Sequence, residues 1–167
     1  MEIYNLKDNL PRLKNCYLTM GTFDGCHIGH QKLFSNLSRE AKENKSQPKI
    51  MMVTILTALS DEDLKATGSN STVNEQVGQL AKLAKEVGTG IVCSGHEAKN
   101  VRKIVGPDIL IFTPGIRMNK ENKDDQQRVC TPLESINNGA NKIIMGRSLI
   151  KGNIEENIDK VSNSIKE

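Results

Sequence analysis

Short apolar runs alternate with segments of helical period along this sequence, and the alternation restricts the fold more than any other feature. Runs short enough for buried strands lie at 16–20, 50–56, 90–93, 109–112 and 143–145. Between and after them, apolar residues recur at steps of three and four, which places them on one face of a helix. Continuous apolar strands alternating with helices indicate parallel strands that are covered by helices on both faces. The predicted fold class is therefore α/β, with a parallel sheet of about five βα units.

The most clearly marked helix is expected at 73–87. Thr72 and Glu75 form a capping box before it, and Gly88 is its stop signal. Its apolar face is expected to comprise Val73, Val77, Leu80, Ala84 and Val87. Other helices are predicted to follow His30 and to lie near 60–66, 97–105, 132–138 and 154–165.

Composition excludes several classes of protein. The 167 residues contain 23 Lys and Arg against 20 Asp and Glu, and only 3% aromatics, so we expect no nucleic-acid partner. This length fits a single domain, 1–167, and is too short for an eight-unit barrel of about 250 residues. No run reaches the roughly 20 apolar residues of a membrane helix, and the polar start is no signal peptide. We therefore predict a cytoplasmic protein without a membrane partner.

Ligands bind at the carboxyl ends of parallel strands, so the loops that follow the strands are the candidate sites. The first such loop, 20–30, has three glycines and two histidines before a helix. The small residues would let the backbone approach a phosphate, and His27 and His30 could donate hydrogen bonds to it. A tight turn with helix-capping histidines is an equal alternative. A metal site is disfavoured, because only Asp24 stands near the histidines as a third ligand, and the four cysteines are too widely spaced for zinc or a disulfide framework.

The segment Gly21–His30 resembles the start of the bacterial bifunctional riboflavin kinase/FAD synthetases. Their signature is Gly-Thr-Phe-Asp-Gly-x-His-x-Gly-His, and the resemblance covers residues 1–37. It implies an FMN adenylyltransferase-like unit that uses ATP with Mg, in which His27 and His30 bind the ATP phosphates. The nucleotide-binding residues that this alternative implies are Gly21, Thr22, Phe23, Asp24, His27, Gly29 and His30. The Ile-Ser-Ser-Thr-x-Ile-Arg-like motif and the kinase domain of that family have no counterpart here.

The rest of the chain, 47–167, resembles the bacterial orotidine 5'-phosphate decarboxylases. The matching segments are 53–57, 91–94, Glu97-Ala98, 113–117, 125–129, Thr131-Pro132 and Gly146-Arg147. The resemblance implies the fifth to eighth strands of a βα barrel and a nucleotide ligand such as UMP or OMP, with no cofactor. The residues that it implies for ligand binding are Thr57, Pro114, Arg117, Gln126, Gly146 and Arg147.

This sequence departs from the decarboxylase pattern at Ala58, Asp124 and Ser148. The family's catalytic Asp-Lys-Asp array is not found in it. Without that lysine, decarboxylation lacks its acid, so catalytic residues stay unassigned. We thus expect a composite of a nucleotidylyltransferase-like βα unit, 1–46, and a decarboxylase-like half-barrel, 47–167. The sheet is expected to be a half-barrel or flavodoxin-like, with a homodimer as one way to cover its edges. A chimeric or remnant domain without activity is the third alternative.

Overall fold

The computed structural model describes residues 28–43, 49–118 and 127–166. It has two compact units, Met1–Lys49 and Ile50–Glu167. The first contributes α1 (Ile28–Glu43), which confirms the helix predicted to follow the glycine-rich loop. The expected strand at 16–20 lies outside the described residues.

The second unit alternates strands and helices as predicted, although its strands are shorter than the apolar runs. Its elements are β1 (Met51–Val53), α2 (Asp61–Ala66), α3 (Val73–Val87), β2 (Gly90–Val92), α4 (Ala98–Val105), β3 (Ile111–Thr113), α5 (Pro132–Asn137), β4 (Lys142–Ile143), α6 (Arg147–Ile150) and α7 (Ile154–Lys166). No helix in the described residues is long and apolar enough to cross a membrane.

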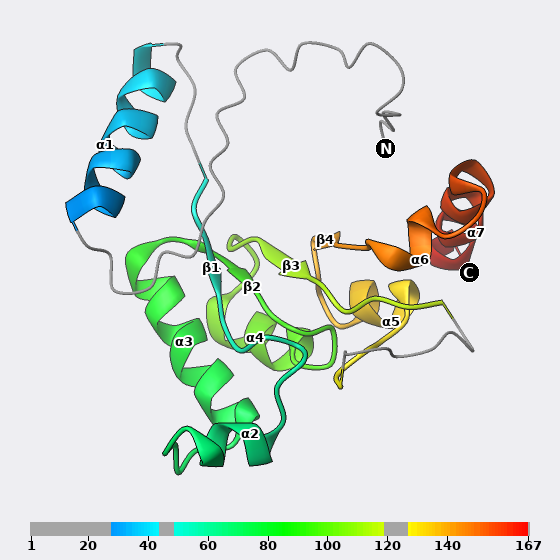
Figure 1. The fold of residues 1–167 in the computed structure, drawn as a ribbon, viewed down its shortest axis with the longest axis horizontal. Helices are drawn as coiled ribbons and strands as arrows, with labels where there is room; N and C mark the ends of the chain where they lie inside the picture. Colours follow the sequence, from blue (N-terminus) through cyan, green and yellow to red (C-terminus); the bar gives the residue numbers. More distant parts are fainter. Residues whose placement is uncertain (1–27, 44–48, 119–126, 167) are drawn as a thin grey trace. The chain divides into compact units, whose positions relative to one another are not determined.

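The four strands lie side by side in chain order, β1-β2-β3-β4, and each neighbouring pair is parallel. Right-handed crossovers between sequential strands place the connecting helices on the same face of a sheet. Figure 1 shows α3, α4 and α5 on one side of these strands. A flavodoxin-like sheet instead reverses its strand order and has helices on both faces. The architecture is therefore that of a half-barrel.

The hydrophobic core lies between the strands and the helices α3 and α4. Ile91 and Ile111 are fully buried there, together with Val77 and Val101 from the two helices. The expected apolar face of α3 is confirmed at Val73, Val77 and Ala84, whereas Val87 at its last turn is 57% exposed.

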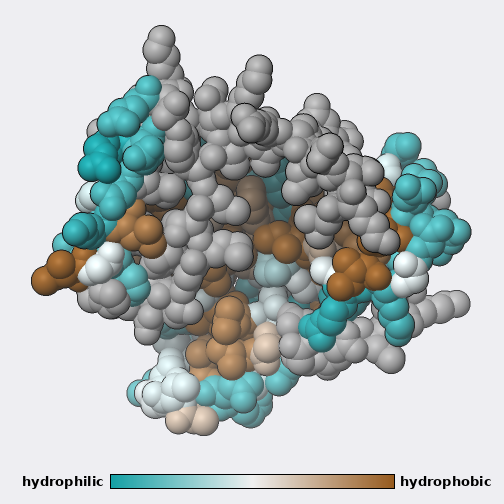
Figure 2. Space-filling model, turned by 45° about the horizontal axis from the view of Figure 1, so that its top comes forward, coloured by the Kyte–Doolittle hydropathy of each residue, from teal (hydrophilic) through white to brown (hydrophobic). Residues whose placement is uncertain are grey.

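The face of the sheet opposite these helices is partly exposed, whereas the sequence predicted helices on both faces. Val53 at the end of β1 is 53% exposed, and Ile144 after β4 is 46% exposed. Figure 2 shows hydrophobic residues, in brown, in several places on the viewed surface. In a closed barrel, side chains from all of the strands fill the inner face. Helices therefore cover only the outer face of a half-barrel, and its inner face stays partly exposed.

Capping residues fix where the helices of this unit begin. The capping box of Thr72 and Glu75 is confirmed, and Gly88 ends α3 in the left-handed conformation with a φ of 71°. Two further boxes begin α2 and α5, with Ser60 paired to Asp63 and Thr131 paired to Glu134. These starts determine the lengths of the loops that leave β1 and β3.

Candidate functional site

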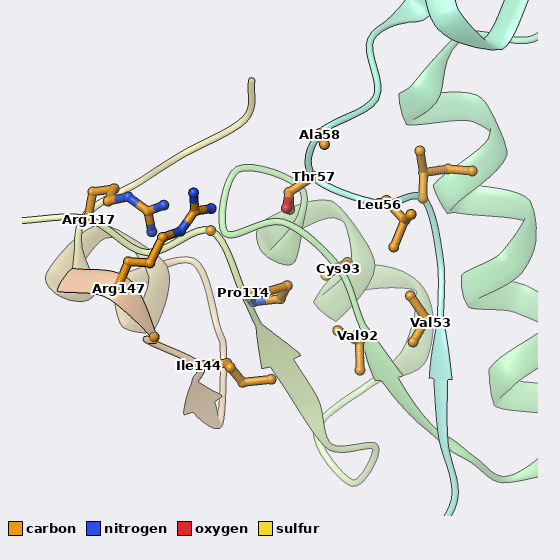
Figure 3. A pocket seen from close by; sticks show the side chains of 13 residues that line it. Val53, Leu56, Thr57, Ala58, Val92, Cys93, Pro114, Arg117, Ile144 and Arg147 are labelled. Carbon is orange, nitrogen blue, oxygen red and sulfur yellow. The ribbon is translucent and has the colours of Figure 1, made fainter. Parts of the chain in front are cut away.

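A cavity of about 440 Å³ opens at the carboxyl ends of the four strands (Figure 3). Its volume falls within the usual range for small-molecule sites. Five of the six residues predicted for nucleotide binding line it, namely Thr57, Pro114, Arg117, Gly146 and Arg147. The sixth, Gln126, lies outside the described residues. The structure thus brings the described candidates together, while their role in binding stays a prediction.

Thr57 occupies the wall of the cavity that follows β1. It is 7% exposed, and its carbonyl oxygen accepts hydrogen bonds from the backbone N–H groups of Gln127 and Arg128, at 3.2 and 3.1 Å. Gly115, with a φ of 73°, brings its backbone close to the Thr57 side chain. A residue with a Cβ would meet both the methyl group of Thr57 and a backbone oxygen there, which accounts for glycine at this position.

Arg117 is held in the wall that follows β3. Its backbone N–H donates to the carbonyl of Cys130 at 3.0 Å, and the N–H of Cys130 donates to Gly115 at 3.3 Å. Its Nη1 donates to the carbonyl of Ile116 at 3.0 Å, and the residue is only 8% exposed. An isolated parallel bridge between Ile116 and Cys130 therefore joins the chain just after β3 to the residues just before α5.

Arg147 is the first residue of α6, and residues 144–146 separate it from the end of β4. Figure 3 shows its guanidinium and that of Arg117 on one side of the cavity, with Val53 and Leu56 on the other. Because α6 has only four residues, the guanidinium rather than a helix dipole supplies positive charge here. Two arginines and no carboxylate are found among the described lining residues, a composition that favours an anionic ligand.

The remainder of the lining is apolar. Val53, Leu56, Val92 and Ile144 contribute aliphatic surface, which suits the flat ring of a base or the carbons of a ribose. Cys93 also lines the cavity, but burial raises the pKa of its thiol to about 12. The thiol thus stays protonated at neutral pH, and Cys93 does not have the thiolate that a nucleophile requires.

The glycine-rich candidates fall mostly outside the described part of the chain. This applies to Gly21, Thr22, Phe23, Asp24 and His27, whereas Gly29 and His30 lie in the first turn of α1. No group of three or more potential metal ligands occurs among the described side chains. The ATP site predicted there remains a prediction.

Sequence reasoning gave no role to Glu97 and Arg128, although both belong to the matching segments. In the structure they form an ion pair between the loops that follow β2 and β3. The two residues are far apart in the sequence, so no local pattern predicts that they pair. The low exposure of both side chains in the structure is what sets this ion pair apart.

Comparisons with known proteins agree with the second resemblance. A family model described as "Orotidine 5'-phosphate decarboxylase / HUMPS family" matches residues 27–158. The match begins before the predicted junction near residue 47 and includes Gly29 and His30. The comparisons do not support the riboflavin kinase/FAD synthetase resemblance, nor the description of the chain as a chimera.

Individual relatives are also named orotidine 5'-phosphate decarboxylase. Orotidine 5'-phosphate decarboxylase from Trichlorobacter lovleyi is 42% identical over 122 residues, which cover 72% of this chain and 50% of the relative. The enzyme from Wolbachia pipientis of Culex pipiens is 49% identical over 102 residues, or 60% of this chain and 45% of that protein. The chain spans about half the length of these curated relatives.

A solved structure supports the fold independently. The crystal structure of orotidine 5'-phosphate decarboxylase from Lactobacillus acidophilus matches with a TM-score of 0.60 and 27% identity, over 78% of this chain and 57% of the other. The family match covers well over half of the sequence and includes the strands whose ends form the cavity. The chain therefore belongs to the orotidine 5'-phosphate decarboxylase / HUMPS family.

Proposed function

We propose that the cavity at the strand ends binds the 5'-phosphate of a pyrimidine nucleotide such as uridylate or orotidylate. The observation that carries this proposal is the presence of Arg117 and Arg147 in one cavity with Thr57. Two guanidinium groups can donate several charge-assisted hydrogen bonds to a phosphate dianion. The aliphatic wall opposite them offers a place for the nucleoside. Gln126 is proposed as a further phosphate ligand by the family resemblance alone.

The proposal is limited to binding. Among the described residues the cavity lining has no lysine, and decarboxylation in this family depends, by the resemblance, on an Asp-Lys-Asp array that this sequence does not contain. We therefore propose a nucleotide-binding half-barrel that releases no carbon dioxide from orotidylate by itself. Orotidine 5'-phosphate decarboxylases need no cofactor, which agrees with the expectation of none.

An ATP-binding role like that of FAD synthetases remains the alternative proposal. The motif Gly21–His30 is its support, and the ligand would be ATP with Mg. Titration with ATP and Mg²⁺, followed by the same titration of His27→Ala, tests it. Unaltered ATP affinity in that variant would remove the alternative.

A homodimer is proposed from the edges of the sheet. In the described part of the chain, β1 and β4 each pair with a strand on one side only, and unpaired parallel edges favour association. Light scattering at micromolar concentration should give the mass of two chains. A monomer with a cooperative melt would contradict this.

The binding proposal is tested by calorimetry with uridylate and uridine. Uridylate should bind measurably, and uridine at least about tenfold more weakly, because only uridylate offers the phosphate to the two arginines. Inorganic phosphate serves as a second ligand that reports on the anion site alone. Equal affinities for uridine and uridylate would overturn the proposal.

A further inference from the structure

Arg128 lies at the junction of the loops that surround the cavity, without lining the cavity itself. Its Nη2 donates hydrogen bonds to the carbonyls of Ile55 and Leu56, at 3.1 and 2.7 Å. Its backbone N–H donates to the carbonyl of Thr57 at 3.1 Å. Three consecutive lining residues after β1 are therefore attached to one arginine.

The other side of the Arg128 guanidinium is paired with Glu97, which follows β2. The Glu97 side chain is 5% exposed, and that of Arg128 is 17% exposed. The second carboxylate oxygen of Glu97 accepts the backbone N–H of Ser94 at 3.0 Å. Glu97 precedes α4 but makes no capping hydrogen bond with its side chain, so its carboxylate serves the loop and not the helix.

Through these contacts the ion pair connects the end of β1 to the end of β2. Ser94 is adjacent to Cys93, a residue that lines the cavity. A buried pair of this kind is costly to break, because the remaining charge then has no partner in a poorly solvated place. A planar guanidinium is also suited to the task, since its donors point in several fixed directions at once.

We infer that Arg128 is a positioning residue, which with Glu97 holds the Ile55–Thr57 wall at the distance from β2 that nucleotide binding requires. This inference rests on the proposed function for its ligand. The contacts between Arg128, Glu97 and the two loops do not depend on it, and they allow a separate test.

The experiment compares Arg128→Met, Glu97→Gln and the double variant. Arg128→Met should weaken uridylate binding about tenfold and lower the melting temperature, because Glu97 becomes a buried carboxylate without its cation. Adding Glu97→Gln removes that charge and should recover most of the melting temperature. It should not recover uridylate affinity, because the carbonyls of Ile55 and Leu56 still have no donor. Arg39→Met is the matched control, since Arg39 forms an exposed pair with Glu40.

Amide hydrogen exchange without ligand provides the second readout. In Arg128→Met the amides of Ser94 and Gln127 should exchange faster, while that of Ile91, which donates to Leu110 in the sheet, should keep its protection. Wild-type affinity in Arg128→Met, or affinity that returns with the melting temperature in the double variant, would overturn the inference. If the wild-type protein binds no uridylate, the proposed function fails. In that case, amides of Ser94 and Gln127 that exchange at the wild-type rate in Arg128→Met would overturn the positioning role as well.

Discussion

Arg102 Nη2 donates a hydrogen bond of 2.6 Å to the side-chain oxygen of Asn141, and the same oxygen accepts the backbone N–H of Ile111 at 2.8 Å. The guanidinium also donates to the carbonyls of Gly139, Gly106 and Ile109. One side chain on α4 therefore joins the start of β3 to the turn before β4. This connection lies at the end of the sheet opposite the cavity.

The first prediction concerns the contribution of Arg102 to stability. Arg102→Ala should reduce the free energy of unfolding by about 2 to 3 kcal/mol, because several buried or half-buried carbonyls lose a charged donor. Denaturant titration measures the change. Lys103→Ala is the control, because Lys103 is the exposed neighbour on the same helix. Equal stability of the two variants would show that water replaces the donor at no cost.

The second prediction concerns the backbone at Gly115. Gly115 and Gly88 have nearly the same φ, 73° and 71°, but an added Cβ at Gly88 meets nothing within 4 Å. At Gly115 it would lie 3.0 Å from the carbonyl oxygen of Arg128 and 3.4 Å from the Thr57 methyl group. Gly88→Ala should therefore cost about 1 kcal/mol from backbone strain alone. Gly115→Ala should cost more and should also weaken uridylate binding, which calorimetry can measure beside the melting temperatures.

The third prediction concerns the stability of the protein at low pH. The backbone N–H of Thr72 donates to Glu75 at 2.8 Å and holds the pKa of this carboxyl below its ordinary value of 4.5. The N–H of Thr131 does the same for Glu134. A pKa that is lower in the folded state gives stability above the unfolded value, and this stability is lost as the pH falls through the folded value.

Melting temperatures should thus fall as the pH is lowered below about 4.5. Glu75→Gln cannot titrate, so its melting temperature should depend less on pH in this range. Gln79→Ala, at an exposed residue of the same helix that has no carboxyl group, is the control and should retain the wild-type slope. A slope in Glu75→Gln equal to that of wild type would contradict the assignment.

Local signals in the sequence predicted local structure well. The Thr72 and Glu75 box, the Gly88 stop and the helix after Pro132 depend on neighbouring residues, and each is present. The boxes at Ser60 and Thr131 have the same spacing and could have been predicted in the same way. The open inner face could not, because it depends on which strands become neighbours. Arg117 and Arg147 were predicted as site residues by the family resemblance, and their place in one cavity agrees with the rule that parallel strands end at one edge of a sheet.

The fourth prediction concerns Arg147. Arg147→Ala should reduce the binding free energy of uridylate by about 2 to 3 kcal/mol, the range for hydrogen bonds to charged groups. The affinity for uridine should change little, because uridine has no phosphate. Lys151→Ala controls for the loss of one positive charge, since Lys151 is exposed just after α6. Equal losses in the two variants would indicate a long-range charge effect instead of a contact, and the dependence on salt would then be the same for both.

The last prediction separates binding from catalysis. Decarboxylation of orotidylate leaves a carbanion-like centre that needs a nearby proton donor. Lys142 begins β4 and is therefore at the amino end of the strand, away from the cavity. Cys93 is a poor donor, because burial raises its pKa to about 12. We expect no measurable release of carbon dioxide from carboxyl-labelled orotidylate by this chain, although orotidylate should compete with uridylate for binding. Turnover near 1 per second, an ordinary rate for an enzyme, would contradict this. His30→Ala would then be the first variant to assay, because His27 and His30 are the candidate acids of the glycine-rich segment and His30 is the one among the described residues.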